Sequence, residues 1–361
     1  MARLTHAVTT WLASTIADFD QRQFDLLDRK PGFPSSHSRL RQMEQDGRWV
    51  VRYLGRRDGS RLRAAIPLAR CRAYSWPDDS YDPCSWNLPS AIADECSPGT
   101  ALLVGGYCDR RSGLHVAAED RTPDRLRSLL VEAAKVAADE GRCLVFPYVY
   151  AEVKQALSEA AHDRIAWAGL AREAHIHGIC DPDWESRLPR DSRHTLRRDR
   201  RRIAATAFTA QEVPWDEASP WAAEMIARHN ARKGRPELPE FVSLRYGDLQ
   251  GLPDVDLVAV SGGAADMRCI QTYVLREDEV EVYEIALTGE DSAERLALYT
   301  HFTLHLPISY ARSRAIDHIR LGFGSEAAKT ARGATLEELY GGVLSVAETK
   351  RLAYEDDRCV L

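Results

Sequence analysis

Positive charge is concentrated in one short run of the sequence, DSRHTLRRDRRRI, between Asp191 and Ile203, although the whole chain has a formal net charge of −6. The arginines of this run are Arg193, Arg197, Arg198, Arg200, Arg201 and Arg202. A guanidinium group keeps its charge, and its planar fork of donors matches a phosphate. On a helix, Leu196 and Ile203 would hold one side against a core and leave the arginines outside. We therefore predict a phosphate-binding face; the alternative is a solvated helix whose arginines pair with carboxylates across a domain interface.

Several polar and aromatic side chains have spacings that suit a small-molecule pocket. His229 and Lys233 are four residues apart and precede a Gly-Arg-Pro turn, so one helix face would present them together. Tyr299 and His301 lie in a long run with helical character and are candidates for lining such a pocket. Aromatic residues and single histidines on helices are also common packing residues, and this alternative stays open for both.

Metal chemistry is not predicted. His175 and His177 alternate in AHIHGI, which has the pattern of a strand, but the sequence offers no further ligand beside them. The eight cysteines are scattered, without a CxxC pair or a close cluster of the kind that holds zinc or builds a disulfide framework. We expect neither a bound metal nor a bound cofactor.

The bulk composition limits the possible classes of protein. With 361 residues, of which 44% are apolar, the chain is long enough for two domains with a large core. The acidic balance argues against a protein that coats nucleic acid over its whole surface, so any contact with a polyanion must be local. The N-terminus lacks the pattern of a signal peptide, and no apolar run is long enough for a membrane span. We expect a cytoplasmic protein, and the oligomeric state stays open.

The first half of the chain is expected to mix strands and helices. RWVVRYLGRRDGSRLRAAIPLARCR contains two β-rich runs around Asp58 and Gly59, which predicts a hairpin. ALLVGGY and CLVFPYV have the pattern of buried strands. TPDRLRSLLVEAAKVAADEG predicts a helix with Thr122 as N-cap, Pro123 at its first position and Gly141 at its end.

The second half repeats this mixture. After the basic run, SPWAAEMIARHNARKG predicts a helix, and VDLVAVSGG, MRCIQTYVLRED and EVEVYEIALTGE predict three strands. SAERLALYTHFTLHLPISYARSRA predicts one long helix, which the strand HIRLGFG and a final helix-turn region follow. The link between the halves is placed near GICDPDWESRLP, where Gly and Pro are concentrated.

Three stretches of the second half carry a resemblance to a known family: LPRDSRHTLRRDRRR, ALYTHFTLHLPISYARSRAIDHIRLG and GFGSEAAKTARGATLEELYGG. They are similar to the arginine-rich helix, the long helix with its following strand, and the closing segment of the Fem-like branch of the GNAT superfamily. This branch includes peptidoglycan-bridge aminoacyltransferases and related bacterial N-acyltransferases. The resemblance covers about residues 183–344.

The resemblance implies an α/β (α+β) fold class with two tandem GNAT-like domains, each a mixed sheet flanked by helices. We expect a degenerate N-terminal domain at residues 1–178. The second domain, at residues 179–361, would carry the basic helix and an acyl-transfer site.

The resemblance also implies the site residues. Glu284 in EVYEIA falls on the strand that lines the acyl site of this fold, so it is the candidate base or amine-orienting group. Tyr283 would point to the opposite face of a regular strand, so only one of the two is expected to face the cleft. Lys329 and Arg332 match family positions near the donor, and their i, i+3 spacing on a short helix would present them together. The alternative for each is a plain surface or capping residue.

The donor is inferred from a departure from the family pattern. Many acyl-CoA-dependent GNAT enzymes hold the pyrophosphate in a glycine-rich turn before a helix. Here the matching segment reads ALTGEDSAER, with the single Gly289 and with Glu290, Asp291 and Glu294 around it. These acids would repel a pyrophosphate, although acids are also common in the first turn of any helix. Either Asp291 or Ser292 is expected as the N-cap.

Three functions compete. The favoured one is an aminoacyltransferase that takes an aminoacyl group from aminoacyl-tRNA and forms an amide on an acceptor amine, which is a small-molecule natural-product intermediate or a cell-wall precursor. The second is an acyl-CoA-dependent N-acyltransferase, and the third is a non-catalytic RNA-binding module on a GNAT scaffold. For the favoured function, the catalytic residues are Glu284, Lys329 and Arg332; the tRNA-binding residues are Arg193, Arg197, Arg198, Arg201 and Arg202; the acceptor-binding residues are Tyr283, Tyr299, His301, His229 and Lys233.

Overall fold

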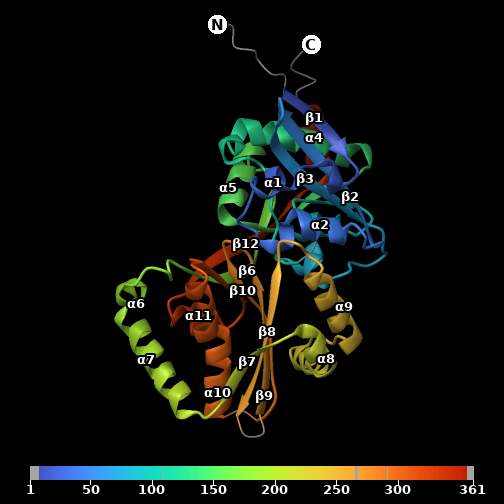
Figure 1. Cartoon of the computed structure of the whole chain (residues 1–361). Helices are drawn as coiled ribbons and strands as arrows, with labels where there is room; N and C mark the ends of the chain where they lie inside the picture. The colour runs from blue at the N-terminus through green and yellow to red at the C-terminus, as the bar shows by residue number, and fades with distance from the viewer. Residues whose placement is uncertain (1–7, 108, 265–266, 291, 356–361) are drawn as a thin grey trace. The chain divides into compact units, whose positions relative to one another are not determined.

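The computed structural model describes residues 8–107, 109–264, 267–290 and 292–355 (Figure 1). The chain divides into two compact units: unit 1 comprises Met1–Ala171 and Glu338–Leu361, and unit 2 comprises Arg172–Glu337. Each unit contains a mixed sheet with helices, as the sequence predicts. None of the described helices combines the length and the apolar character that a membrane crossing needs.

Unit 1 is built on strands in the order β1, β2, β3, β4, β5, β12, of which only β4 and β5 pair in parallel. Its strands are β1 (Val8–Ala13), β2 (Trp49–Asp58), β3 (Arg61–Cys71), β4 (Ala101–Val104) and β5 (Cys143–Tyr150), with the C-terminal part of β12 (Thr335–Leu344). Its α-helices are α1 (Gln21–Asp25), α2 (His37–Met43), α3 (Ser90–Ala93), α4 (Pro123–Asp139), α5 (Ala151–Ala160) and α13 (Val346–Tyr354). Short 3-10 turns cover Ile16–Asp18, Phe33–Ser35, Asp79–Tyr81, Pro83–Ser85 and Ala118–Asp120.

Local signals in the first half are confirmed. The hairpin of β2 and β3 turns at Gly59 and Ser60, directly after Asp58, and Gly59 has the positive φ of 59° that such a turn favours. Helix α4 has Thr122 as N-cap and Pro123 at its first position. Gly141 follows its end with φ of 68°, which a residue without a Cβ adopts at no steric cost.

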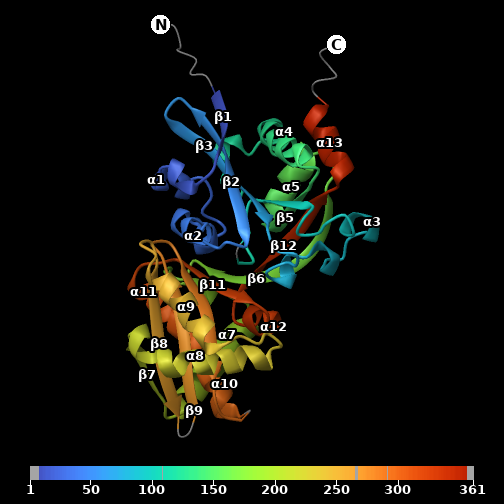
Figure 2. The same ribbon diagram turned by 90° about the vertical axis from the view of Figure 1, so that its right-hand side faces the viewer.

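The C-terminal segment belongs to unit 1, so the expectation that all of residues 179–361 form the second domain is wrong. The predicted final helix-turn region contains the helices α12 (Glu326–Thr330) and α13, but the strand β12 lies between them and pairs antiparallel with β5, with Leu344 opposite Leu144. Helix α13 then packs beside α4 (Figure 2). The chain enters unit 2 within β6 (Ala166–His177) and leaves it within β12, so the boundary lies a few residues before the predicted one.

Unit 2 has strands in the order β6, β11, β10, β9, β8, β7. Besides β6, these are β7 (Thr209–Val213), β8 (Asp256–Ala264), β9 (Met267–Leu275), β10 (Val280–Leu287) and β11 (His318–Phe323). The α-helices are α6 (Trp184–Arg187), α7 (Arg190–Ala205), α8 (Trp215–Arg232), α9 (Pro239–Gln250), α10 (Ala293–Thr300), α11 (Leu306–Ser313) and α12 (Glu326–Thr330). Helices α7, α10 and α11 lie on one side of the sheet, and α8 and α9 lie on the other (Figure 1).

The two faces of the unit 2 sheet differ in character. Alternate residues of β8 to β11 point into an apolar core that α10 and α11 close, with Leu298 and Phe302 fully buried there. The opposite face of β6 and β11 carries Glu173, His175 and Arg320, which are also buried. One face therefore stabilises the fold, and the other gathers groups that could do chemistry.

The predicted long helix is interrupted. A π-helical segment, His301–His305, separates α10 from α11, and the backbone N–H of Leu306 donates to the carbonyl of His301. The cause is Pro307, because a proline has no N–H for an i to i−4 bond and its ring clashes with the preceding turn.

The placement of β12 in unit 1 predicts the effect of a core substitution. Leu344 is fully buried in the core of unit 1, so Leu344→Ala is expected to lower the free energy of unfolding by about 2–5 kcal/mol. The matched control is Leu296→Ala, because Leu296 is 47% exposed and exposed positions change stability by about 0.5 kcal/mol or less. Urea unfolding measures the stability of both variants. Equal urea midpoints would show that β12 is not part of this core.

Candidate functional site

Strand β10 contains a β-bulge at the predicted site. Its pairing with β9 shifts by one residue between Val282 and Glu284, so Tyr283 is the extra residue. Val282 and Ile285 both pack against the apolar core on one face. Tyr283 and Glu284 therefore share the other face, and our expectation that only one of them faces the site is wrong because the strand is not regular.

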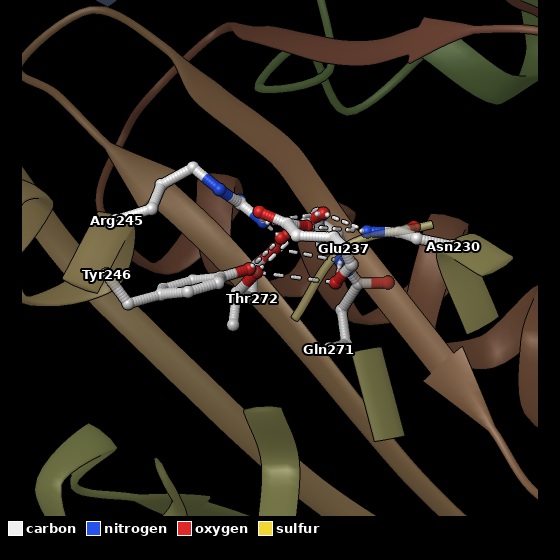
Figure 3. A network of polar contacts seen from close by, with 7 residues as sticks. Asn230, Glu237, Arg245, Tyr246, Gln271 and Thr272 are labelled. Carbon is white, nitrogen blue, oxygen red and sulfur yellow. Dashed lines mark hydrogen bonds and ion pairs between the residues drawn. The ribbon is translucent and has the colours of Figure 1, made fainter. Parts of the chain in front are cut away.

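The carboxylate of Glu284 is held by side chains from two helices (Figure 3). Arg245 Nη1 of α9 donates to Oε2 at 2.7 Å, and the Tyr246 hydroxyl donates to the same oxygen at 2.7 Å. Asn230 Nδ2 of α8 donates to Oε1 at 3.2 Å. Arg245 is itself shared with Glu237, 2.9 Å away. Glu284 is thus fixed in one orientation as an acceptor, with about 20% of its side chain exposed.

The backbone around Glu284 is held as firmly as its carboxylate. Gln271 Nε2 donates to the Glu284 carbonyl at 2.7 Å, and the Glu284 N–H donates to Thr272 Oγ1 at 3.2 Å. Both partners lie on β9, beside the bulge (Figure 3). These bonds satisfy backbone groups that the irregular pairing would leave unpaired.

Tyr246 links this network to the packing of unit 2. Its ring stacks on Trp215 with centroids 3.9 Å apart, and the residue is fully buried. Burial raises the pKa of Tyr246 well above its usual value, so the hydroxyl keeps its proton and serves as a donor. Sequence analysis missed Arg245 and Tyr246 because it did not identify α9. The Pro239 that begins this helix was the available local signal.

Two of the predicted acceptor residues lie near Glu284. His229 and Lys233, at the C-terminal end of α8, both interact electrostatically with its carboxylate. Burial, followed by the charge of Lys233, lowers the pKa of His229 to about 4, so its imidazole is neutral at pH 7. Together with Tyr283, these residues border the carboxylate that would meet an acceptor.

Tyr299 and His301 lie on the other side of the sheet. Tyr299 packs against the apolar core of unit 2. The ring of His301 packs on Phe208, with centroids 4.8 Å apart. The structure therefore does not bring either residue to Glu284, and their contacts are those of packing residues.

Lys329 lies on α12, and its side chain reaches the C-terminal end of β11. Its Nζ donates to the carbonyls of Leu321, Gly322 and Phe323 at 2.7, 3.0 and 3.1 Å. An ammonium has three hydrogens, so these bonds match its full donor capacity. Burial lowers the pKa of Lys329 to about 8. The residue fixes the strand end, and a direct catalytic role stays a prediction.

Strands β10 and β11 separate near this point. Their parallel pairing is formed by Val280 with Ile319 and by Glu281 with Arg320. The register of β11 with β6 also shifts between Arg320 and Gly322. On β10, the bulge with Glu284 lies just beyond the residues that pair with β11. On β11, the carbonyls bound by Lys329 lie just beyond the residues that pair with β10.

Arg332 pairs with the basic helix. Its Nε donates to Asp199 Oδ2 at 2.7 Å, its Nη2 donates to Oδ1 at 3.3 Å, and its Nη1 donates to the Ala328 carbonyl at 2.7 Å. Asp199 is 3% exposed, so the one acid inside RRDRRR faces inward. The guanidinium therefore binds α7 through Asp199, and the catalytic role of Arg332 stays a prediction.

The other arginines of α7 face outward. The helix buries Ser192, Leu196 and Asp199 on one side, as the sequence predicts for Leu196. Arg200 forms a bidentate ion pair with Glu185. Among the described residues, no carboxylate lies within ion-pair distance of the remaining arginines, which are Arg190, Arg193, Arg197, Arg198, Arg201 and Arg202. All of these except the half-buried Arg193 are exposed.

A side chain caps the N-terminus of α10. Its N-cap is Ser292, whose hydroxyl accepts from the Arg295 N–H at 3.1 Å. Glu294 lies in the first turn, and a carboxylate there compensates the positive end of the helix. Asp291, the other predicted N-cap, lies outside the described residues.

Comparisons with known proteins identify relatives by structure alone. No protein-family model matches the sequence, and no curated protein is similar enough to match it. FemX is 12% identical with a TM-score of 0.60, over 91% of this chain and 96% of that one. A tandem GNAT protein from the clavulanic acid biosynthesis pathway is 11% identical with a TM-score of 0.52, over 93% and 98%.

A third likeness is to the C-terminal domain of an Agrobacterium fabrum protein assigned as a lysylphosphatidylglycerol synthetase. It is 10% identical with a TM-score of 0.52, over 95% of this chain and 97% of that one. The three alignments each span both compact units of the chain, which agrees with the resemblance found in the sequence. The chain therefore shares the fold of FemX and of the tandem GNAT protein.

Proposed function

We propose that this chain is a GNAT-fold transferase that moves an aminoacyl group from aminoacyl-tRNA to an acceptor amine and so forms an amide. The acceptor is a small-molecule amine or a cell-wall precursor. The observation that carries the proposal is the arginine face of α7, defined as Arg190, Arg197, Arg198, Arg201 and Arg202. These exposed arginines have no ion-pair partner among the described residues.

Unpaired surface arginines support a polyanionic ligand. Several like charges on one helix repel each other, and a structural role would offset this with carboxylates. On α7 the single internal acid, Asp199, instead binds Arg332 on the buried side. Phosphates along an RNA backbone would supply the missing negative charge, and arginine binds them in bidentate fashion.

An acyl-CoA donor has less support. Its pyrophosphate would need backbone N–H groups at the start of α10. The side chain of Ser292 already caps that end, and Glu294 adds negative charge.

The chemistry asked of the site is modest. The nitrogen lone pair of the amine attacks the ester carbonyl and the bond to the ribose oxygen breaks. The proton that the nitrogen loses ends on that oxygen, which leaves as the free hydroxyl of the tRNA. Glu284 accepts hydrogen bonds from Arg245, Tyr246 and Asn230, so both of its carboxylate oxygens are already engaged and its orientation is fixed. We therefore assign Glu284 the orientation of the amine rather than the uptake of its proton.

The two substrates would meet at the point where β10 and β11 separate. Helix α7, which carries the arginine face, lies on the α10 and α11 side of the sheet (Figure 1). Helices α8 and α9, on the other side, bring Asn230 and Arg245 to Glu284. A donor ester reaching between the two strands would meet an amine at Glu284. Lys329 would act as a positioning residue, because it holds the β11 end of this opening.

The first prediction concerns RNA binding. Replacing Arg197, Arg198 and Arg202 with Gln is expected to weaken tRNA binding, because these side chains would no longer neutralise phosphates. The slope of log K against log salt should fall by about one for each phosphate that is no longer neutralised. Filter binding at several salt concentrations measures both quantities.

The control for this prediction removes the same charge elsewhere. Arg61, Arg228 and Arg351 have side chains that are 67%, 58% and 61% exposed and pair with surface carboxylates. Their triple Gln variant should bind tRNA like the unaltered protein. Equal losses in the two triple variants would mean that only overall charge matters, and the arginine face would lose its role.

The second prediction concerns Glu284. Glu284→Gln keeps the size of the side chain but removes its charge, and we expect turnover of aminoacyl-tRNA to fall on the order of 10²-fold with tRNA affinity unchanged. The measurement uses the primary amine that the unaltered protein accepts best. Glu237→Gln is the matched control, because it removes the other carboxylate on Arg245 and leaves Glu284 in place. A Glu237→Gln variant as slow as Glu284→Gln would assign the loss to a displaced Arg245.

The third prediction concerns Lys329. Lys329→Met leaves three carbonyls without their donor, so we expect a loss of about 1–3 kcal/mol in the free energy of unfolding. Lys350→Met, at an exposed lysine, should leave stability unchanged. A Lys329→Met protein that is as stable as the parent but inactive would contradict the positioning role and favour direct contact with the donor.

A further inference from the structure

Three histidines meet on the polar face of the unit 2 sheet. His175 and His177 come from β6, and His318 comes from the neighbouring strand β11. One ring nitrogen of each lies within 4.8 Å of those of the other two. The sequence showed only the first pair, because His318 is 143 residues from His175 along the chain.

Two of these rings form a row between two carboxylates. His175 Nε2 lies 2.9 Å from Glu173 Oε2, and His175 Nδ1 lies 2.9 Å from His318 Nε2. At the far end, His318 Nδ1 lies 3.6 Å from Glu279 Oε2. The row therefore has three contacts between electronegative atoms: carboxylate to ring, ring to ring, and ring to carboxylate.

The contact between His175 and His318 can be filled in two ways. Each neutral ring carries one N–H. The 3.6 Å between His318 Nδ1 and Glu279 Oε2 is too long for a hydrogen bond, so the N–H of His318 can point to His175. If the rings instead turn their N–H groups toward the carboxylates, two lone pairs face each other across 2.9 Å, and a cation between them would bind both.

The two carboxylates at the ends of the row are buried and paired. Glu173 and Glu279 are 1% and 4% exposed, and the guanidinium of Arg320 bridges them at 3.0 and 2.6 Å. Arg276 Nη1 also lies 4.0 Å from Glu279 Oε1. These contacts hold both carboxylates beside the histidine rings.

We infer that His175, His177 and His318 form a binding site for a divalent transition-metal ion of the Zn²⁺ class. Neutral imidazole is a preferred ligand of such ions. Glu173 and Glu279 are placed as the outer carboxylates that orient metal-binding histidines through their second ring nitrogen. The site would leave at least one coordination position for water or another ligand.

The geometry requires one adjustment. With bonds of 2.0–2.1 Å to a tetrahedral ion, ligand nitrogens lie about 3.3 Å apart. The contact between His175 and His318 is close to this value, whereas the widest separation in the cluster must shorten by about 1.5 Å. The ring of His177 stacks on that of His318 with centroids 4.4 Å apart, so it must turn to bind. His177 is exposed, which leaves it space to do so.

Direct titration tests the site. Untagged full-length protein, stripped with a chelator and dialysed, is titrated with Zn²⁺ in a calorimeter and with Co²⁺ while visible absorption is recorded. We expect one equivalent of either ion per chain and ligand-field bands of Co²⁺ bound to nitrogen. His177→Gln and His318→Gln should each weaken binding at least about tenfold, and Glu173→Gln should weaken it about 10–100-fold.

The controls separate this site from adventitious binding. His194→Gln changes an exposed histidine of α7 and should bind metal like the parent. His177→Gln alters an exposed side chain, so its circular dichroism spectrum should match the parent and its metal affinity can be interpreted. The inference is overturned if the parent binds no stoichiometric metal ion, or if His177→Gln and His318→Gln bind it as the parent does. In either case a proton, rather than a metal ion, completes the row.

Discussion

The ion pair between Asp199 and Arg332 determines what the basic helix presents. Asp199 is the one acid inside RRDRRR, and its carboxylate is buried against a guanidinium from the segment after α12. Because this acid faces inward, it does not neutralise the arginines on the exposed sides of α7. The same contact fixes the helix to the segment that begins with Lys329. The arginine face of α7 and the end of β11 are thereby linked through this charge-assisted contact.

The bulge at Tyr283 determines which residues of β10 lie on each face of the unit 2 sheet. One extra residue keeps Val282 and Ile285 in the apolar core and moves both Tyr283 and Glu284 to the polar face. Two helices then surround the carboxylate with donors. Burial of a charged group is unfavourable unless it is paired, so this network stabilises Glu284 in place. A site with fixed polar groups orients a substrate without reorganisation of its own.

The sequence predicted the features that depend on local signals. The hairpin at Asp58, the caps of α4 and the amphipathic α7 all follow from residues within a few positions of each other. Features that depend on distant partners were missed. β12 is a strand of unit 1 because it pairs with β5, almost 200 residues earlier in the chain.

The candidate site shows the same limit. Arg332 lies 133 residues from Asp199, and Arg245 lies 39 residues from Glu284, so neither contact has a signature in spacing. A bulge also has no local signature, and a rule of strict alternation misplaces Tyr283. The most direct test of the account is to incubate the protein with a mixture of aminoacyl-tRNAs and a panel of primary amines, and separately with acetyl-CoA and the same amines. Mass spectrometry then records donor consumption and products. The account predicts aminoacyl amides from the tRNA reaction alone, whereas acetylated amines with intact aminoacyl-tRNA would contradict it.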